Sequence, residues 1–98
     1  MIEVRQTETF LTWFKELKDR RAKARIQARI DRLELGNFGD VAPVGGGVSE
    51  LRIHYGPGYR VYFIQVDLVV VILLSSGDKS SQDSDIKKAK EFAKQLGD

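Results

Sequence analysis

Apolar residues recur at helical spacing in the first third of the chain. The first stripe places apolar side chains at i, i+3, i+4 and i+7, in the order Phe10, Trp13, Phe14 and Leu17. This spacing predicts an amphipathic helix whose aromatic side packs into a core, and Thr7 is its expected N-cap. A second stripe predicts a helix that ends near Gly36, with the apolar positions Ala22, Ile26, Ile30 and Leu33. A tight turn near Asp19 is expected to join the two helices as an antiparallel hairpin.

Alternation of apolar and polar residues predicts strands elsewhere. Ile2 and Val4 indicate a short first strand, and residues 50–63, ELRIHYGPGYRVYF, indicate a β-hairpin. Residues 68–74 are rich in β-branched side chains and apolar on both faces, which is typical of a strand in the middle of a sheet. Residues 36–49 hold five of the nine glycines and are expected to form a flexible connector.

A last helix is expected from about Asp83 to Leu96, with Ser81 or Asp83 as its cap. The predicted element order is therefore β-α-α-β-β-β-α, with three consecutive strands forming a meander. This order indicates one α+β domain over residues 1–98. We expect a small, mostly antiparallel β-sheet with the N-terminal helical hairpin on one face and a C-terminal helix.

The register of the hairpin follows from its pattern if Gly56-Pro57-Gly58 is a three-residue loop. His54 then faces Arg60, Arg52 faces Tyr62, and Ile53 faces Val61. One side of the hairpin is dry, with Leu51, Ile53, Val61 and Phe63. The other side is polar, with Glu50 at its margin and with Arg52, His54, Arg60 and Tyr62.

The polar side of the hairpin carries the candidate chemistry. In this register Arg52 and Arg60 are diagonal neighbours, close enough to act on one anion, and Lys79 beyond the central strand adds a third cation. Guanidinium, imidazole and phenol groups together suit a phosphodiester and its flanking bases. The alternative is structural: Arg52 pairs with Glu50 or with an acidic side chain of the last helix, and Tyr62 covers the edge of the sheet.

Composition narrows the functional classes. The chain has no cysteine, which excludes disulfides and thiolate chemistry, and its single histidine argues against a zinc site. No metal or cofactor is therefore expected. The apolar run at residues 68–74 is too short to span a bilayer and the N-terminus has no signal-peptide layout. These features predict a cytoplasmic protein with no membrane partner.

The net charge of +2 is unevenly spread. Residues 20–32 contain one acidic residue and six basic residues, a local charge of +5: Arg20, Arg21, Lys23, Arg25, Arg29 and Arg32. Such a block suits an anionic partner such as RNA, DNA or an acidic protein segment, and Arg25 and Arg29 are candidate RNA-binding residues. A solvated helix face is the alternative.

The chain resembles the RelE/ParE superfamily of toxins from bacterial type II toxin–antitoxin pairs, and in particular the HigB-like or phage-type "addiction module killer protein" branch. The resemblance covers nearly the full length. It rests on the N-terminal strand and helical hairpin, and on the pattern L-R…G-x-x-Y/W-R-V-x-Y/F within residues 51–63. It continues through the strand, Lys-containing turn and terminal helix of VVVILLSSGDKSSQDSDIKKAKEFA, residues 69–93.

This resemblance implies a RelE-like fold and a growth-arresting mRNA interferase. Such a toxin is a metal-independent, ribosome-dependent endoribonuclease in which a ribose 2′-hydroxyl attacks the neighbouring phosphodiester. The implied partners are mRNA, the ribosome and a cognate antitoxin with a helix-turn-helix, and operator DNA is reached only through the antitoxin. By position, Arg60 and Arg52 would hold the phosphate and Lys79 would act as a third cation or a proton-transfer group. His54 and Tyr62 would serve acid–base catalysis and base stacking, with Tyr55 as a further RNA contact.

One feature departs from the ribonucleases of this superfamily. Several of them carry a catalytic His or Tyr near the C-terminus, whereas no imidazole or phenol follows Tyr62 here. Two other functions therefore stay open: a non-enzymatic ParE-like poison of DNA gyrase, and a binding module that acts with the antitoxin as a co-repressor.

Overall fold

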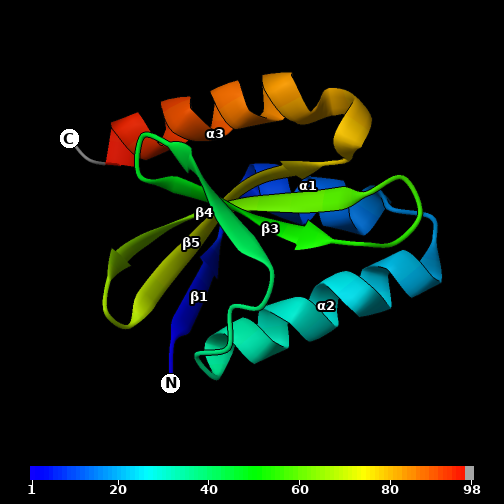
Figure 1. The fold of residues 1–98 in the computed structure, drawn as a ribbon, viewed down its shortest axis with the longest axis horizontal. Helices are drawn as coiled ribbons and strands as arrows, with labels where there is room; N and C mark the ends of the chain where they lie inside the picture. The colour runs from blue at the N-terminus through cyan, green and yellow to red at the C-terminus, as the bar shows by residue number, and fades with distance from the viewer. Residues whose placement is uncertain (97–98) are drawn as a thin grey trace.

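The computed structural model describes residues 1–96, which form a five-stranded sheet flanked by helices on both faces (Figure 1). The strand order in space is β1-β5-β4-β3-β2. The elements in chain order are β1 (Glu3–Gln6), α1 (Glu8–Glu16), α2 (Arg20–Glu34), β2 (Val41–Gly45), β3 (Val48–Ile53), β4 (Tyr59–Asp67), β5 (Val70–Gly77), the short 3₁₀ helix η1 (Lys79–Ser81) and α3 (Gln82–Leu96).

The sheet is mostly antiparallel, which confirms the predicted α+β class. β1 pairs in parallel with β5, and the other three pairings are antiparallel. β5 lies between β1 and β4, as expected of an apolar strand in the middle of a sheet. It begins at Val70 because Leu68 and Val69 form the turn after β4, where the Val69 N–H donates to the Asp67 carboxylate at 2.7 Å.

The expectation of a flexible connector at residues 36–49 is wrong. This segment contains β2, which pairs with β3 and forms one edge of the sheet, and it also contains the start of β3. Pro43 is compatible with an edge strand because one side of its backbone needs no partner. Gly45 ends β2 and Gly46 and Gly47 form the turn into β3, and all three have positive φ, so the glycines that suggested flexibility instead build a tight turn.

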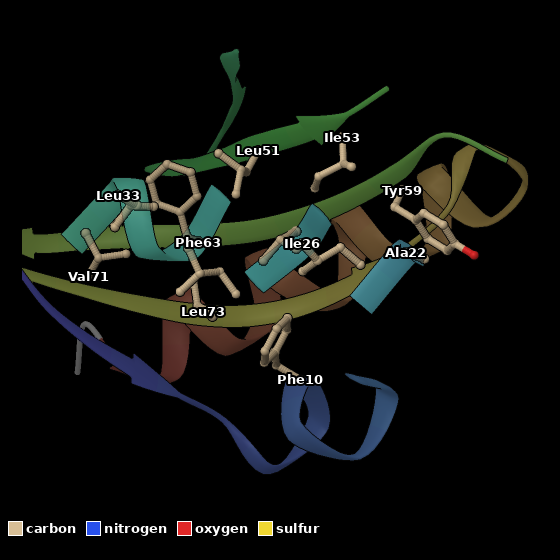
Figure 2. Close-up of a cluster of buried hydrophobic side chains, with 12 residues drawn as sticks. Phe10, Ala22, Ile26, Leu33, Leu51, Ile53, Tyr59, Phe63, Val71 and Leu73 are labelled. Atoms are coloured by element: carbon tan, nitrogen blue, oxygen red, sulfur yellow. The ribbon is translucent and has the colours of Figure 1, made fainter. Parts of the chain in front are cut away.

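The two N-terminal helices pack on one face of the sheet, as predicted. Phe10 of α1 and the apolar stripe of α2 share a buried cluster with β3, β4 and β5 (Figure 2). The Thr7 hydroxyl accepts the Phe10 N–H at 3.1 Å and donates to the Leu74 carbonyl at 2.7 Å, so the predicted cap also ties α1 to β5. Asp19 caps α2 by accepting the N–H groups of Arg21 and Ala22.

The last helix, α3, covers the opposite face. It buries Ala89 and Ala93 against a second cluster with Val48, Tyr62 and Leu74. This is the face on which the polar side of the hairpin was expected to lie open. Part of that side is therefore under a helix, and Tyr62 is fully buried there.

The observed hairpin register differs from the predicted one. Arg52 pairs with Arg60 and Leu51 with Val61, so the loop spans the five residues 54–58 instead of three. Gly56 and Gly58 both have positive φ, which permits the longer loop. The shift is even, so every strand side chain keeps its predicted face. The dry side accordingly lies in the first buried cluster, with Leu51, Ile53, Val61 and Phe63.

Candidate functional site

An open pocket of about 420 Å³ lies at the tip of the β3–β4 hairpin. Its lining includes four of the five predicted catalytic residues: Arg52, His54, Arg60 and Lys79. Arg52 and Arg60 reach it from directly opposed positions on β3 and β4, and the hairpin loop supplies the remaining wall. Two guanidinium groups, an ammonium and an imidazole therefore surround one cavity.

The turn after β5 brings Lys79 to the hairpin. The Lys79 N–H donates to the Pro57 carbonyl at 3.4 Å, so η1 is joined to the tip of the loop. Asp78 caps η1 by accepting the Ser80 N–H at 2.8 Å, and the hydrogen bond from the Ser80 hydroxyl, helped by that N–H, lowers the pKa of Asp78. The Lys79 side chain itself is exposed. Lys79 lines the pocket, and no acidic group within residues 1–96 pairs with its ammonium.

Two carboxylates compensate the arginines. Arg52 donates to Asp40 Oδ1 through Nη2 at 2.8 Å and Nε at 3.2 Å, and its Nη1 lies 3.8 Å from Glu50. Arg60 Nε lies 3.5 Å from Glu50 Oε2, and the Arg60 side chain is only 15% exposed. The structural alternative for Arg52 is thus partly correct, with Asp40 as its main partner. The pocket remains cationic, with three cations against two carboxylates.

Glu50 is the buried centre of this network. It is 5% exposed and lies between the two guanidinium groups, and the Gln82 side-chain amide donates to it at 3.3 Å. Arg60 Nη1 also donates to the Gly58 carbonyl at 3.0 Å. Arg60 is therefore held in one orientation by the hairpin and by the start of α3.

Asp40 is a functional candidate that sequence reasoning missed. The exposed His54 ring hydrogen-bonds through Nε2 to Asp40 Oδ2, which leaves Nδ1 available. Hydrogen bonds from His54 and Arg52 lower the pKa of Asp40, so it remains a carboxylate. The Arg52 N–H donates to the Asp40 carbonyl at 3.0 Å and fixes its backbone. No sequence signal marked Asp40, because its position depends on the pairing of β2.

Tyr62 does not belong to the pocket, so its expected role in catalysis and stacking is wrong. Its side chain is fully buried beneath α3, and its hydroxyl has no hydrogen-bond partner among residues 1–96. Burial, together with the nearby carboxylates of Glu50 and Asp85, raises the pKa of Tyr62. The phenol can therefore neither exchange protons with the pocket nor stack on a base.

The predicted RNA-binding residues of α2 divide into two roles. Arg29 donates to three backbone carbonyls, those of Phe38, Asp40 and Arg52, and burial lowers its pKa. Arg29 therefore has a structural role, holding the Asp40 segment against β3, and it is not free for the RNA contact that was expected of it. Arg25 is exposed, and its guanidinium carbon lies 4.8 Å from the centroid of the Tyr55 ring.

Tyr55 lies beside the pocket in the hairpin loop and is half-buried. Its hydroxyl donates to Asp19 at 3.0 Å, and this hydrogen bond raises the pKa of Tyr55. A phenol held in this way presents an aromatic surface and does not act as an acid near neutral pH. Arg25 and Tyr55 thus form a cation–π pair between α2 and the pocket.

Two further features bear on cofactors and location. Within residues 1–96, no cluster of three His, Asp or Glu side chains is arranged to hold a metal ion. None of the helices in this part of the chain has both the length and the apolar character needed to cross a membrane.

One relative identifies the family of this chain, although no protein-family model matches its sequence. The chain is 55% identical over 96 residues to an uncharacterized protein of Haemophilus influenzae, and the match covers 98% of this chain and 97% of that protein. Over this length and at this identity, the chain belongs to the same protein family as the H. influenzae protein.

Proposed function

We propose that this protein is the toxin of a type II toxin–antitoxin pair, of the RelE/ParE kind, and that it cleaves mRNA at the hairpin pocket without a metal. The observation that carries the proposal is the convergence of three cations and one oriented imidazole around a single open pocket. Phosphodiester cleavage by an internal 2′-hydroxyl needs a base, an acid and positive charge at the phosphorus, and side chains of the types suited to these roles line this pocket.

His54 is the proposed general base. An ionised Asp40 only accepts hydrogen bonds, so in the neutral ring it fixes the tautomer with the proton on Nε2 and leaves the lone pair on Nδ1. Nδ1 takes the proton of the 2′-hydroxyl while the 2′-oxygen forms a bond to phosphorus. The bond from phosphorus to the 5′-oxygen then breaks, and the Lys79 ammonium protonates the leaving oxygen. The products are a 2′,3′-cyclic phosphate and a 5′-hydroxyl end.

The arginines stabilise the extra negative charge on the pentacoordinate phosphorus. Arg52 is about one-third exposed, and its Nη1 makes no hydrogen bond within residues 1–96. It is the arginine best placed to contact the phosphate directly. Arg60, which Glu50 holds in place, supplies a fixed field from the floor of the pocket.

The partners proposed for this activity follow from the same assignment. The toxin would act in the cytoplasm on mRNA held by the ribosome, and a cognate helix-turn-helix antitoxin would neutralise it and carry the complex to operator DNA. The exposed arginines of α2 give support, because Arg21, Arg25 and Arg32 have no acidic partner within residues 1–96.

A second candidate is the non-enzymatic gyrase poison. The observation that favours it is the burial of Tyr62 and most of Arg60, which leaves His54 and Lys79 to perform all the proton transfer. The two candidates differ in what they leave intact. A nuclease cuts RNA and spares the chromosome, whereas a gyrase poison leaves mRNA whole and traps broken DNA.

The deciding experiment induces the protein briefly in cells and maps new RNA 5′ ends. We expect discrete cuts with 5′-hydroxyl ends, reduced about 10²–10⁴-fold by His54→Gln and about 10²-fold by Lys79→Gln. Lys87→Gln is the matched control, because this exposed lysine of α3 does not line the pocket. Cuts that persist in both pocket variants would refute the site, and growth arrest with intact mRNA and gyrase-linked DNA breaks would favour the poison.

A further inference from the structure

A second cleft, of about 520 Å³, lies between α1 and the start of α3 and shares no lining residue with the hairpin pocket. One helical face of α1 and one of α3 form its walls, and the C-terminal end of β5 forms its floor. Figure 1 shows this end of β5 passing α1 on its way to η1 and α3. The cleft is acidic, although the protein as a whole is basic: Lys88 is its one basic lining residue, and its carboxylates are those of Glu8, Glu16 and Asp85.

Asp85 is a buried carboxylate without a cation. It is 9% exposed and accepts a hydrogen bond from the Ser81 hydroxyl, but no Lys, Arg or His nitrogen within residues 1–96 lies within 4.0 Å of it. Gly77 makes room for it, because a Cβ at that position would lie 1.8 Å from Asp85 Oδ2. Buried carboxylates are normally paired with a cation, whereas Asp85 has none within residues 1–96.

Ser76 is a second buried polar group without a partner in the same cleft. Its side chain is 7% exposed and lines the cleft, and its hydroxyl makes no hydrogen bond within residues 1–96. Such orphaned groups are rare in folded proteins and point to a missing partner. Trp13 lines the cleft as well, and an indole face is the best aromatic partner for a cation.

We infer that this cleft receives an arginine side chain from an extended segment of a partner protein. A guanidinium has five donors in a planar fork, so it can bind the Asp85 carboxylate, donate to the Ser76 hydroxyl and stack on the Trp13 ring at once. A metal ion does not fit, because no cluster of three metal-binding side chains is present within residues 1–96. The volume is typical of a ligand site.

The size and charge of the cleft argue that the arginine belongs to a protein segment. The edge of β5 beyond β1 is taken by the start of α1, because the Thr7 N–H and hydroxyl donate to the carbonyls of Leu73 and Leu74. The cleft of about 520 Å³ is larger than one arginine side chain, so the residues that flank the arginine in an extended segment also fit beside Asp85. The cleft and the hairpin pocket share no lining residue, and the inference does not depend on the proposed nuclease activity.

The test titrates the full-length, ¹⁵N-labelled protein, without RNA, with the peptide acetyl-Gly-Gly-Arg-Gly-Gly-amide. The backbone amides of Ser76 and Gly77 and the Trp13 indole are the reporters. We expect saturable shifts with a Kd of about 1 mM, as suits a single anchoring side chain. The citrulline peptide, which has the same shape but no charge, is expected to bind at least about tenfold more weakly. Argininamide lacks the flanking backbone and should also bind more weakly than the peptide.

Variants locate the binding site. Asp85→Asn is expected to weaken binding of the arginine peptide about tenfold, and Lys88→Gln to strengthen it about twofold by removing a competing cation. Glu91→Gln, an equal change of charge elsewhere on α3, should have no effect. If Asp85→Asn does not fold, Glu8→Gln at the exposed start of α1 replaces it, with an expected weakening of about twofold.

Several results would overturn the inference. Equal binding of the arginine and citrulline peptides would refute a cation site, as would wild-type affinity in a folded Asp85→Asn variant. Shifts confined to the hairpin or to α2 would place the peptide elsewhere. If argininamide binds as tightly as the peptide, the flanking backbone contributes nothing, and the inference that the arginine belongs to a protein segment is wrong. None of these outcomes bears on RNA cleavage, which is measured separately.

Discussion

The hairpin pocket and the acidic cleft use buried carboxylates in opposite ways. In the pocket, Glu50 lies between two guanidinium groups and Asp40 binds Arg52 and His54, so both carboxylates have cationic partners within the protein. In the cleft, Asp85 is almost as buried as Glu50 but has a hydroxyl as its only partner within residues 1–96. The first arrangement fixes the side chains of the pocket through internal ion pairs, whereas the second leaves a buried carboxylate without a cation among the described residues.

The largest expected effect is the loss of Glu50. Glu50→Leu leaves the mostly buried Arg60 guanidinium without its carboxylate, and breaking a buried ion pair from one side costs about 3–5 kcal/mol of unfolding free energy. Urea denaturation followed by circular dichroism measures this loss. The double variant Glu50→Leu, Arg60→Met should recover most of it, because two apolar side chains can replace a buried pair. A single variant as stable as the wild type would show that Glu50 and Arg60 do not form an effective pair.

Asp85→Asn should behave differently in the same measurement. The amide keeps an oxygen that can accept from Ser81, and no cation within residues 1–96 is left unpaired by the change. The lost charge in the first turn of α3 removes a favourable dipole interaction of about 0.3–1 kcal/mol, which relief from burying a carboxylate offsets. We therefore expect a stability within about 1 kcal/mol of the wild type. A loss as large as that of Glu50→Leu would mean that the cleft is already internally paired.

The contrast between these sites also shows what a sequence can predict. The faces of β3 and β4 follow from the alternation of Leu51, Ile53, Val61 and Phe63, and they survive the error in loop length because an even shift preserves them. The gathering of Arg52, Arg60 and Lys79 depends only on those faces and on the turn after β5. Local sequence patterns were therefore sufficient to predict that these three cationic side chains lie together at the pocket.

The parts that local patterns could not predict all depend on contacts between distant segments. Asp40 reaches His54 only because β2 joins the sheet. The sequence of β2, VAPVG, is short and contains Pro, so it lacks the usual pattern of a strand. Tyr62 alternates like an exposed residue but is buried because α3 packs over its face. The acidic cleft joins residues of α1, β5 and α3, and no spacing along the chain reveals it.

The smallest expected effect is a pH dependence of stability that arises from Asp40 in the hairpin pocket. Hydrogen bonds from His54 and Arg52 lower the pKa of Asp40 in the folded protein, below the value of about 3.9 of an unfolded chain. Its contribution to stability is therefore fully present above that unfolded value and is lost as the pH falls through the folded pKa. Urea unfolding from pH 5 down to pH 2 should show Asp40→Asn less stable than the wild type at the upper end, with the difference closing as the acid protonates Asp40. Because the internal countercharges act only on an ionised Asp40, a gap that stays constant across this range would mean that its hydrogen bonds to His54 and Arg52 do not hold it as a carboxylate.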